Sequence, residues 1–399
     1  MDKINEYQRV YAKIDLDALN YNFKNIASIT NDETKIIAVL KTDAYGHCAV
    51  PLAKDLEGQD KLWGFALATA EEAMILRNSG ITKPLLILGY TFPNAYEEMI
   101  KNDITFTVFR KETLGKLAQV CRKISTPSQK FKAKIHIKVD TGMGRIGILP
   151  DNDGIDFIKE AISYEELDVE GIFTHLAKSD DQDRCFTMNQ LSIYNSFVER
   201  IKNELDFEFK LKHVLNSAGI IEYPEADFDA VRAGIILYGL WPSEDVSKDR
   251  IDLKPVFSLY SSIVYIKNVL PNTPISYGGT YVSDKVTKVA TVSIGYGEGY
   301  PRSLSNKAEV LVKGIRCPII GRICMDQLMI DVSQINDVTE GDIVTLIGAD
   351  GDDCITMEEL GALSGRFNYE MACDFGKRIP RVFIKDHQVK YTKDYYLDF

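Results

Sequence analysis

The segment KIIAVLKTDAYGH (residues 35–47) joins a short apolar run to a lysine, Lys41, and then to a turn containing Gly46. Apolar runs of this length, rich in β-branched residues, are typical of strands buried on both faces of a parallel sheet. Seven further apolar runs follow in order along the chain. They cover residues 62–67, 84–88, 104–109, 134–139, 169–174, 212–216 and 229–233.

Segments with helical spacing separate several of these runs. Residues 68–77 (ATAEEAMILR) are helix-like and Ser79-Gly80 indicates a stop, while residues 186–205 carry apolar side chains at helical spacing. Eight strand–helix units in about 240 residues predict a (β/α)8 barrel, that is, a TIM barrel. Strand counting by itself leaves a doubly wound open sheet as the alternative.

The pattern changes near Asp252. From there to about residue 350 the chain consists of short apolar runs separated by turn-forming residues, followed by a helical stretch at 356–367. We therefore predict two domains, an α/β barrel at 1–250 and a mostly β domain at 251–399. This division is compatible with packing of the first ten or so residues on the β domain.

Composition limits the classes of function. The 399-residue chain is 45% hydrophobic and 26% charged, so it can bury two domain cores. Its net charge of −11 argues against nucleic-acid and anionic-membrane partners, although a local basic site for an anionic cofactor is compatible with it. The start MDKINEYQRV lacks an apolar signal region. Seven cysteines without a CxxC pair and only five histidines disfavour a disulfide framework and a metal site, so we expect a cytoplasmic protein without a metal.

Lys41 directly follows the first predicted strand. Barrel enzymes place their active sites at the carboxyl ends of the strands, so a lysine there projects from the mouth of the barrel. Such a lysine can lose its proton through burial or a neighbouring cation and then form a Schiff base. From position alone, a solvated lysine at a strand end remains the alternative.

The segment KTDAYGH resembles the cofactor-lysine motif of alanine racemases, usually KANAYGHG. The matching residues are Lys41, Ala44, Tyr45, Gly46 and His47, and the differing ones are Thr42, Asp43 and Cys48. The resemblance implies a barrel followed by a β domain, with pyridoxal 5'-phosphate (PLP) held covalently by Lys41 and contacted by Tyr45.

Further motifs of the same family follow in order. KVDTGMGRIG (138–147) resembles the segment whose arginine, here Arg145, contacts the phenolic oxygen of the cofactor and the substrate. A lysine seven residues earlier is often carbamylated in relatives, so the resemblance points to carbamylation of Lys138, with a plain strand lysine as the alternative. THLAKSDD contains His175, which in the family supports the catalytic tyrosine and belongs to the cofactor site.

Two loops after the seventh and eighth apolar runs match the usual phosphate site of barrels. NSAG (216–219) and RAGIILYG (232–239) supply a hydroxyl and backbone N–H groups. The resemblance implies that Arg232 faces the pyridine nitrogen of PLP, and that the other cofactor contacts are Asn216, Ser217, Gly234 and Ile235.

The second half of the resemblance lies in the predicted β domain. Tyr277 in PISYGGTY matches a catalytic base, and Tyr369 in FNYE matches a tyrosine that contacts the cofactor phosphate. Tyr300 in IGYGEGYPR and Met325 in GRICMDQ are assigned to the carboxylate of the substrate. The chain has 20 tyrosines, most of which must serve packing, so the assignment depends on the collinear order of the motifs.

The implied activity is interconversion of L- and D-alanine, which would supply D-alanine for peptidoglycan. Inversion at a planar carbon requires a base on each face, and the resemblance assigns Lys41 to the D-isomer and Tyr277 to the L-isomer. It also implies a homodimer in which Tyr277 and Met325 reach the cofactor of the other subunit.

Three alternatives stay open from the sequence. A PLP-dependent amino-acid decarboxylase shares the two-domain plan but presents an acidic residue where this chain has Arg232. A non-enzymatic PLP-binding barrel would lack the β domain. A racemase for serine or for a wider range of amino acids is the strongest rival, although Tyr369 favours a small side chain.

Overall fold

The computed structural model describes residues 9–397, and its first domain is a closed barrel of eight parallel strands. Every predicted run of the first domain forms one of these strands, and β9 pairs back with β2. The TIM-barrel prediction is therefore confirmed, and the open-sheet alternative is excluded. The strands are β2 (Lys35–Val39), β3 (Leu62–Leu67), β4 (Leu85–Ile87), β5 (Ile104–Val108), β6 (Ala133–Lys138), β7 (Leu167–Phe173), β8 (Leu211–His213) and β9 (Ala230–Ala233).

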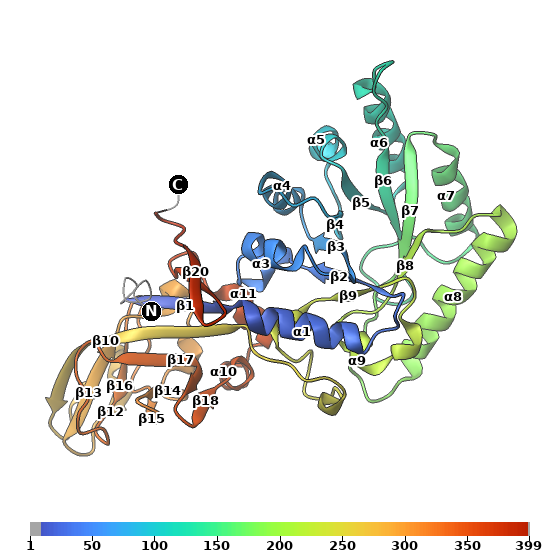
Figure 1. Ribbon diagram of the computed structural model, residues 1–399. Helices are drawn as coiled ribbons and strands as arrows, with labels where there is room; N and C mark the ends of the chain where they lie inside the picture. The colour runs from blue at the N-terminus through green and yellow to red at the C-terminus, as the bar shows by residue number, and fades with distance from the viewer. Residues whose placement is uncertain (1–8, 398–399) are drawn as a thin grey trace.

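Helices surround this barrel (Figure 1). Helix α4 begins after Thr69, whose hydroxyl accepts a hydrogen bond from the Glu72 backbone N–H in a capping box, and it ends before Ser79, as predicted. The predicted helix at 186–205 is α8. The helices of this part of the chain are α1 (Leu16–Ser28), α2 (Lys41–Tyr45), α3 (Ala49–Leu56), α4 (Ala70–Asn78), α5 (Tyr96–Lys101), α6 (Lys111–Ile124), α7 (Asn152–Ser163), α8 (Cys185–Leu205) and α9 (Ser217–Glu222). No helix within residues 9–397 is long and apolar enough to cross a membrane.

The second domain is mostly β, as predicted, and is built on a ten-stranded sheet. Its longest strand, β10 (Phe257–Val269), pairs with β13, β17 and β1. The other strands are β11 (Pro274–Ile275), β12 (Tyr281–Val282), β13 (Thr287–Val292), β14 (Glu309–Val312), β15 (Ile315–Pro318), β16 (Leu328–Asp331), β17 (Ile343–Asp350), β18 (Asp353–Ile355), β19 (Arg381–Lys385) and β20 (Gln388–Lys393), with helices α10 (Met357–Ser364) and α11 (Asn368–Asp374).

The first strand of the chain lies in this second sheet. β1 (Val10–Asp15) is inserted between β10, with which it runs antiparallel, and β19, with which it runs parallel. Figure 1 shows β1 beside β10. The chain then enters the barrel domain through α1. Residues 10–15 therefore belong to the sheet of the β domain, although they precede the barrel in the sequence. Residues 1–8, which include most of the segment for which packing on the β domain was considered, lie outside the described residues.

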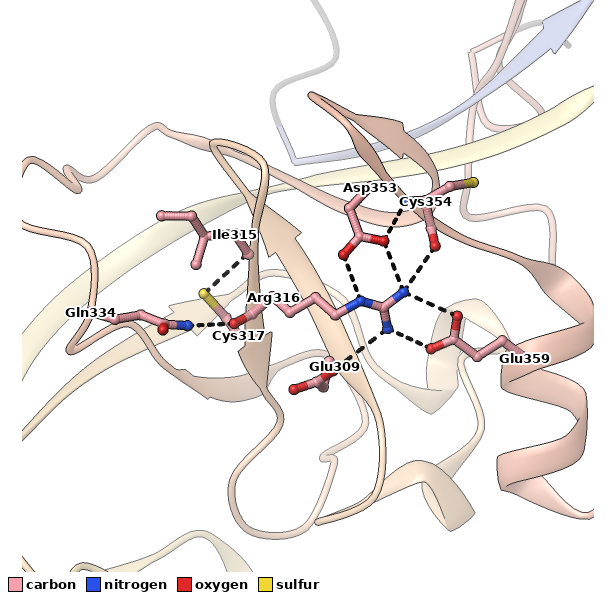
Figure 2. Close-up of polar contacts among 8 residues, drawn as sticks. All are labelled: Glu309, Ile315, Arg316, Cys317, Gln334, Asp353, Cys354 and Glu359. Carbon is pink, nitrogen blue, oxygen red and sulfur yellow. Dashed lines mark hydrogen bonds and ion pairs between the residues drawn. The ribbon is translucent and has the colours of Figure 1, made fainter.

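One arginine joins three parts of the β domain (Figure 2). The guanidinium of Arg316 on β15 lies between Asp353 on β18 and Glu359 on α10, with Nε 2.7 Å from the first carboxylate and Nη1 2.7 Å from the second. Glu309 on β14 is a third, longer ion-pair partner at 3.5 Å. This cluster holds α10 against the sheet, and α10 in turn packs on α11, the helix that carries Tyr369.

The segment after Lys41 has an unusual backbone. Thr42, Asp43, Ala44 and Tyr45 have φ values of 56°, 50°, 56° and 52°, so α2 is a left-handed turn made of non-glycine residues. Each such residue is disfavoured by roughly 1–2 kcal/mol, so side chains must hold the turn. Asp43 Oδ1 accepts from the Ala49 N–H at 2.7 Å, and the ring of His47 bonds through Nδ1 to the Ala44 and Tyr45 carbonyls.

Candidate active site

A cavity of about 300 Å³ opens at the carboxyl ends of the barrel strands. It collects the residues that the sequence predicted in the first domain, together with Tyr369 of the second. Of the described residues that line it, Asp180 alone is acidic, whereas four are lysines or arginines, so basic side chains predominate in the cavity. The predicted residues at its wall are Lys41, Tyr45, Lys138, Arg145, His175, Asn216, Ser217, Arg232, Gly234, Ile235 and Tyr369.

Lys41 follows β2 and lies at the wall of this cavity. Burial lowers the pKa of its ammonium group, and the nearby charge of Arg145 lowers it further, against opposing effects of Cys373 and Glu72. The left-handed turn begins immediately after it and places Tyr45 at the same cavity. The structure therefore supplies an amine that loses its proton more readily than an ordinary lysine.

Lys138 ends β6 and is 2% exposed. Its Nζ donates a hydrogen bond to the Val139 carbonyl at 2.6 Å and lies 5.6 Å from the centre of the Phe173 ring. Burial lowers the pKa of Lys138 to about 7, with further lowering by Arg232, an opposing effect of Asp140 and a smaller lowering by Arg145. A substantial fraction of this amine is therefore neutral at physiological pH.

Arg232 on β9 is 3% exposed and is held by backbone and imidazole acceptors. Nη2 donates to the carbonyls of Thr174 (2.8 Å) and Val214 (2.7 Å), and Nη1 donates to Nδ1 and the carbonyl of His213 (2.7 and 2.9 Å). Nη2 also lies 3.2 Å from Nδ1 of His175. Burial lowers the pKa of Arg232 to about 9, so the guanidinium stays protonated at neutral pH.

His175 follows β7 and is kept neutral. Burial, with Arg232 and Arg145, holds the pKa of His175 well below its ordinary value. A guanidinium can only donate, so Nδ1 of His175 accepts from Arg232 and the proton of the neutral ring is on Nε2. His175 can thus offer a hydrogen-bond donor to a further group.

The loops after β8 and β9 form a narrow polar cradle. The Gly234 N–H donates to Ser217 Oγ at 3.0 Å. A Cβ on Gly234 would lie 3.1 Å from the Tyr45 hydroxyl and 3.4 Å from Ser217 Oγ, so only glycine leaves this corner free. The Asn216 side chain caps α9 by accepting from the Gly219 N–H.

The predicted residues of the β domain fall into two groups. Tyr369 lies at the cavity, with its ring 6.0 Å from that of Tyr45 and stacked on Phe367. Tyr277 and Met325 do not line it, and these residues are 69% and 53% exposed. The single chain therefore does not bring these two residues to Lys41.

Tyr300 does not fit the predicted contact with substrate. It is fully buried, and its hydroxyl has no hydrogen-bond partner among the described residues. Tyr296 in the same motif is 42% exposed, and its loop lies against Met325, since the Gly297 N–H donates to the Met325 carbonyl at 2.7 Å.

The sequence contained a signal that favours Tyr296. It is flanked by Gly295 and Gly297, and a Cβ on either would lie 2.4 or 3.0 Å from the Met325 carbonyl oxygen. Paired glycines around a tyrosine thus mark a close approach of two backbones at this surface, whereas Tyr300 belongs to the core.

Comparisons with known proteins agree with this geometry. The family model "Alanine racemase, N-terminal domain" matches residues 14–242, and "Alanine racemase, C-terminal domain" matches residues 256–383. Alanine racemase of Methanococcus maripaludis is 43% identical over 94% of this chain and 98% of its own length, and that of Clostridium tetani is 42% identical over 97% and 98%.

Solved structures give the same result. An alanine racemase of Clostridium difficile superposes with a TM-score of 0.91 at 39% identity, covering 98% of this chain and 99% of its own. A histidine racemase of Leuconostoc mesenteroides reaches a TM-score of 0.85 at 29% identity, covering 95% and 98%. With full-length relatives above 40% identity and both family domains matched in order, this chain belongs to the alanine racemase family.

Proposed function

We propose that this protein interconverts L- and D-alanine with PLP as its cofactor, and that it supplies D-alanine for peptidoglycan. The observation that carries the proposal is the position of Lys41, a lysine of lowered pKa, at a cationic cavity in the mouth of the barrel. Membership of the alanine racemase family supports the same reaction.

The residues at the cavity fit PLP. The phosphate would lie in the cradle of Tyr45, Ser217, Gly234 and Ile235, where the absence of a Cβ at Gly234 leaves space for an anion. Tyr369 would add a hydroxyl to this cradle. When bound, the cofactor stabilises negative charge at the substrate Cα by conjugation.

The two arginines would contact different atoms of the cofactor ring system. Arg145 would donate to the phenolic oxygen, and Arg232 would face the pyridine nitrogen. Because Arg232 is protonated and can only donate, a nitrogen beside it is kept unprotonated. The absence of an acidic residue at this position argues against the decarboxylase alternative.

The proton transfers require a base on each face of the substrate Cα. Lys41 supplies one, since burial and Arg145 favour its free amine. Tyr277 would supply the other from a second subunit, because it is exposed and lies outside the cavity of its own chain. The Nε2–H of His175 would donate to the phenolic oxygen of Tyr277, which lowers the free energy of removing the tyrosine proton.

The same second subunit would hold the substrate carboxylate. Tyr296 and Met325 lie on neighbouring backbone segments of the β domain and are both exposed. We propose this pair in place of Tyr300 and Met325. A homodimer with shared sites follows, since a complete site needs Lys41 of one chain and Tyr277 of the other.

Lys138 is proposed to be carbamylated. Its neutral amine can add to CO2, forming an N–C bond and releasing one proton, and the product is an anion beside Arg145 and Arg232. The carbamate would accept from Arg145 and fix its orientation toward the cofactor.

The substrate range needs its own test, since a protein named histidine racemase has a similar structure. Tyr369, stacked on Phe367, narrows the cavity and favours alanine. Replacing Tyr369 by Asn should enlarge the cavity and raise serine turnover relative to alanine. Equal turnover of both amino acids by the unmodified enzyme would make it a broad-specificity racemase.

One experiment tests the activity. The purified protein, with and without added PLP, is incubated with L-alanine, L-serine and L-histidine, and the D-isomers are separated by chiral chromatography. Borohydride reduction should attach the cofactor to the peptide containing Lys41. Lys41→Ala should lose both activity and label, whereas Lys54→Ala, an exposed lysine on α3, should keep both. Absence of D-alanine would refute the proposed substrate, and absence of a D-isomer from all three substrates would refute racemisation altogether.

A further inference from the structure

A line of polar side chains crosses the interior of the barrel behind the cavity. Glu170 on β7, His136 on β6, His213 on β8 and Arg232 on β9 come from four adjacent strands. Oε2 of Glu170 lies 3.3 Å from Nε2 of His136, Nδ1 of His136 lies 2.9 Å from Nε2 of His213, and Nδ1 of His213 lies 2.7 Å from Nη1 of Arg232. The two histidines are fully buried, while the Glu170 side chain is 21% exposed.

The ends of this line fix the direction of every hydrogen bond in it. Arg232 can only donate, so Nδ1 of His213 accepts and its proton must be on Nε2. That proton is donated to Nδ1 of His136, which places the proton of His136 on Nε2, where it meets the carboxylate of Glu170. Both imidazoles are therefore neutral Nε2–H tautomers, polarised between a guanidinium and a carboxylate.

The packing of the barrel is shaped around these rings. A Cβ on Gly171 would lie 2.8 Å from three atoms of the His136 ring, so the glycine beside Glu170 makes room for it. The Phe173 ring stacks on His213 with centroids 4.6 Å apart, and Trp63 lies 5.7 Å from His136. The rings are thus held in the orientation that the hydrogen bonds need.

The charges around the line differ at its two ends. Among residues 9–397, Arg232 forms no ion pair with a carboxylate, and the charged or ionisable side chains that interact with it electrostatically include two basic residues, Arg145 and Lys138. The buried Tyr194 also faces Arg232. Glu170 faces Lys134 and Lys210, and the hydrogen bond from His136 lowers the pKa of its carboxyl group. Glu170 is therefore the carboxylate to which Arg232 is connected.

We propose that Glu170, acting through His136 and His213, is the remote counter-charge of Arg232, and that these three are positioning residues that set the orientation and effective charge of the guanidinium at the cavity. The role toward the cofactor rests on the proposed function, while the hydrogen-bond relay does not. The carboxylate makes His213 a stronger acceptor, which draws positive charge of Arg232 away from the cavity.

The relay can be tested without cofactor. In the apo-protein with 15N-labelled histidine, long-range 1H–15N correlation spectra distinguish the two imidazole tautomers, and the chain has only five histidines to assign. His136 and His213 should both be Nε2–H tautomers at neutral pH. An Nδ1–H tautomer or a protonated imidazolium at either position would overturn the proposal.

Glu170→Gln removes the charge but keeps an oxygen that can accept from His136. This variant should shift the ring signals of His136 and, to a smaller extent, of His213. Asp168→Asn on the same strand is the matched control, since Asp168 pairs with Lys210 and is not part of the line. If Glu170→Gln moves the His213 signals no more than Asp168→Asn does, the relay is refuted.

The loaded enzyme gives the second measurement. Glu170→Gln should lower kcat for racemisation by about 2- to 30-fold, the range for changes along a connected network, and should alter the visible absorbance of bound PLP with little change in KM. Asp168→Asn should leave both unchanged. If the wild type does not racemise amino acids but the histidine signals respond as expected, the proposed function fails and the relay stands. An active wild type with no response to Glu170→Gln overturns the relay alone.

Discussion

Lys138→Met should make the apo-protein more stable, and by an amount that depends on pH. The fold holds this lysine 2% exposed and lowers its pKa from 10.5 to about 7. Between these two values the unfolded chain binds a proton that the folded chain does not, so wild-type stability rises with pH across this window. Methionine removes the dependence while keeping a similar volume.

The two pKa values give the size of the effect. The lowered pKa of Lys138 reduces the free energy of unfolding by roughly 4 kcal/mol at pH 7 and by roughly 2 kcal/mol at pH 9. These values take about 1.4 kcal/mol per pKa unit. Loss of the hydrogen bond from Nζ to the Val139 carbonyl offsets part of the gain at both pH values. The diagnostic quantity is therefore the difference between the two gains, about 2 kcal/mol.

Urea unfolding of the apo-protein in CO2-free buffer at pH 7 and pH 9 measures both gains. Lys134→Met is the matched control on the same strand, because Lys134 is about a third exposed and pairs with Asp103 at the surface. The Lys134→Met substitution should change the free energy of unfolding by no more than about 1 kcal/mol at either pH. A gain from Lys138→Met that is the same at both pH values would show that the lysine is charged in the folded protein, and the argument for its carbamylation would then fail.

Three other experiments test the proposed site. Mixing inactive Lys41→Ala and Tyr277→Phe proteins should restore part of the activity, since one hybrid site is then intact, and no recovery after verified subunit exchange would place the whole site in one chain. Arg232→Glu should lower racemisation by at least about 10-fold, the effect of about 1.4 kcal/mol on the barrier, and should produce a long-wavelength absorbance band and more transamination product. Unchanged racemisation without that band would show that Arg232 does not contact the cofactor ring. Tyr296→Phe should raise the KM for alanine several-fold while Tyr300→Phe leaves it unchanged, and the reverse result would restore Tyr300 to the substrate site.

The barrel could be predicted from the sequence because its strands are covered on both faces. Each strand then becomes a continuous apolar run, and runs such as 35–40 and 104–109 are recognisable without knowledge of their partners. The pairing of β1 with β10 and β19 is different, since those partners lie about 250 and 370 residues further along the chain. No local pattern in residues 10–15 specifies them.

The site was predictable to the extent that motifs specify positions in the chain. The motifs predicted Lys41, Arg145 and Arg232 as site residues, and the barrel places all three at one cavity. A motif does not show which of its residues are buried. For this reason the sequence prediction assigned the substrate contact to Tyr300, which is buried, and not to Tyr296, which is exposed. The lowered pKa of Lys138 likewise arises from packing that the sequence does not display.

The placement of β1 has a consequence for folding during synthesis. Residues 10–15 leave the ribosome long before their parallel partner β19, which begins at Arg381. The barrel strands between residues 35 and 233 can pair as soon as they have emerged, because their contacts lie within that segment. Strand β1 must therefore stay unpaired on its β19 side until residues 381–384 have emerged. A protein truncated before Arg381 should keep a barrel but present an open strand edge, which is a site for aggregation.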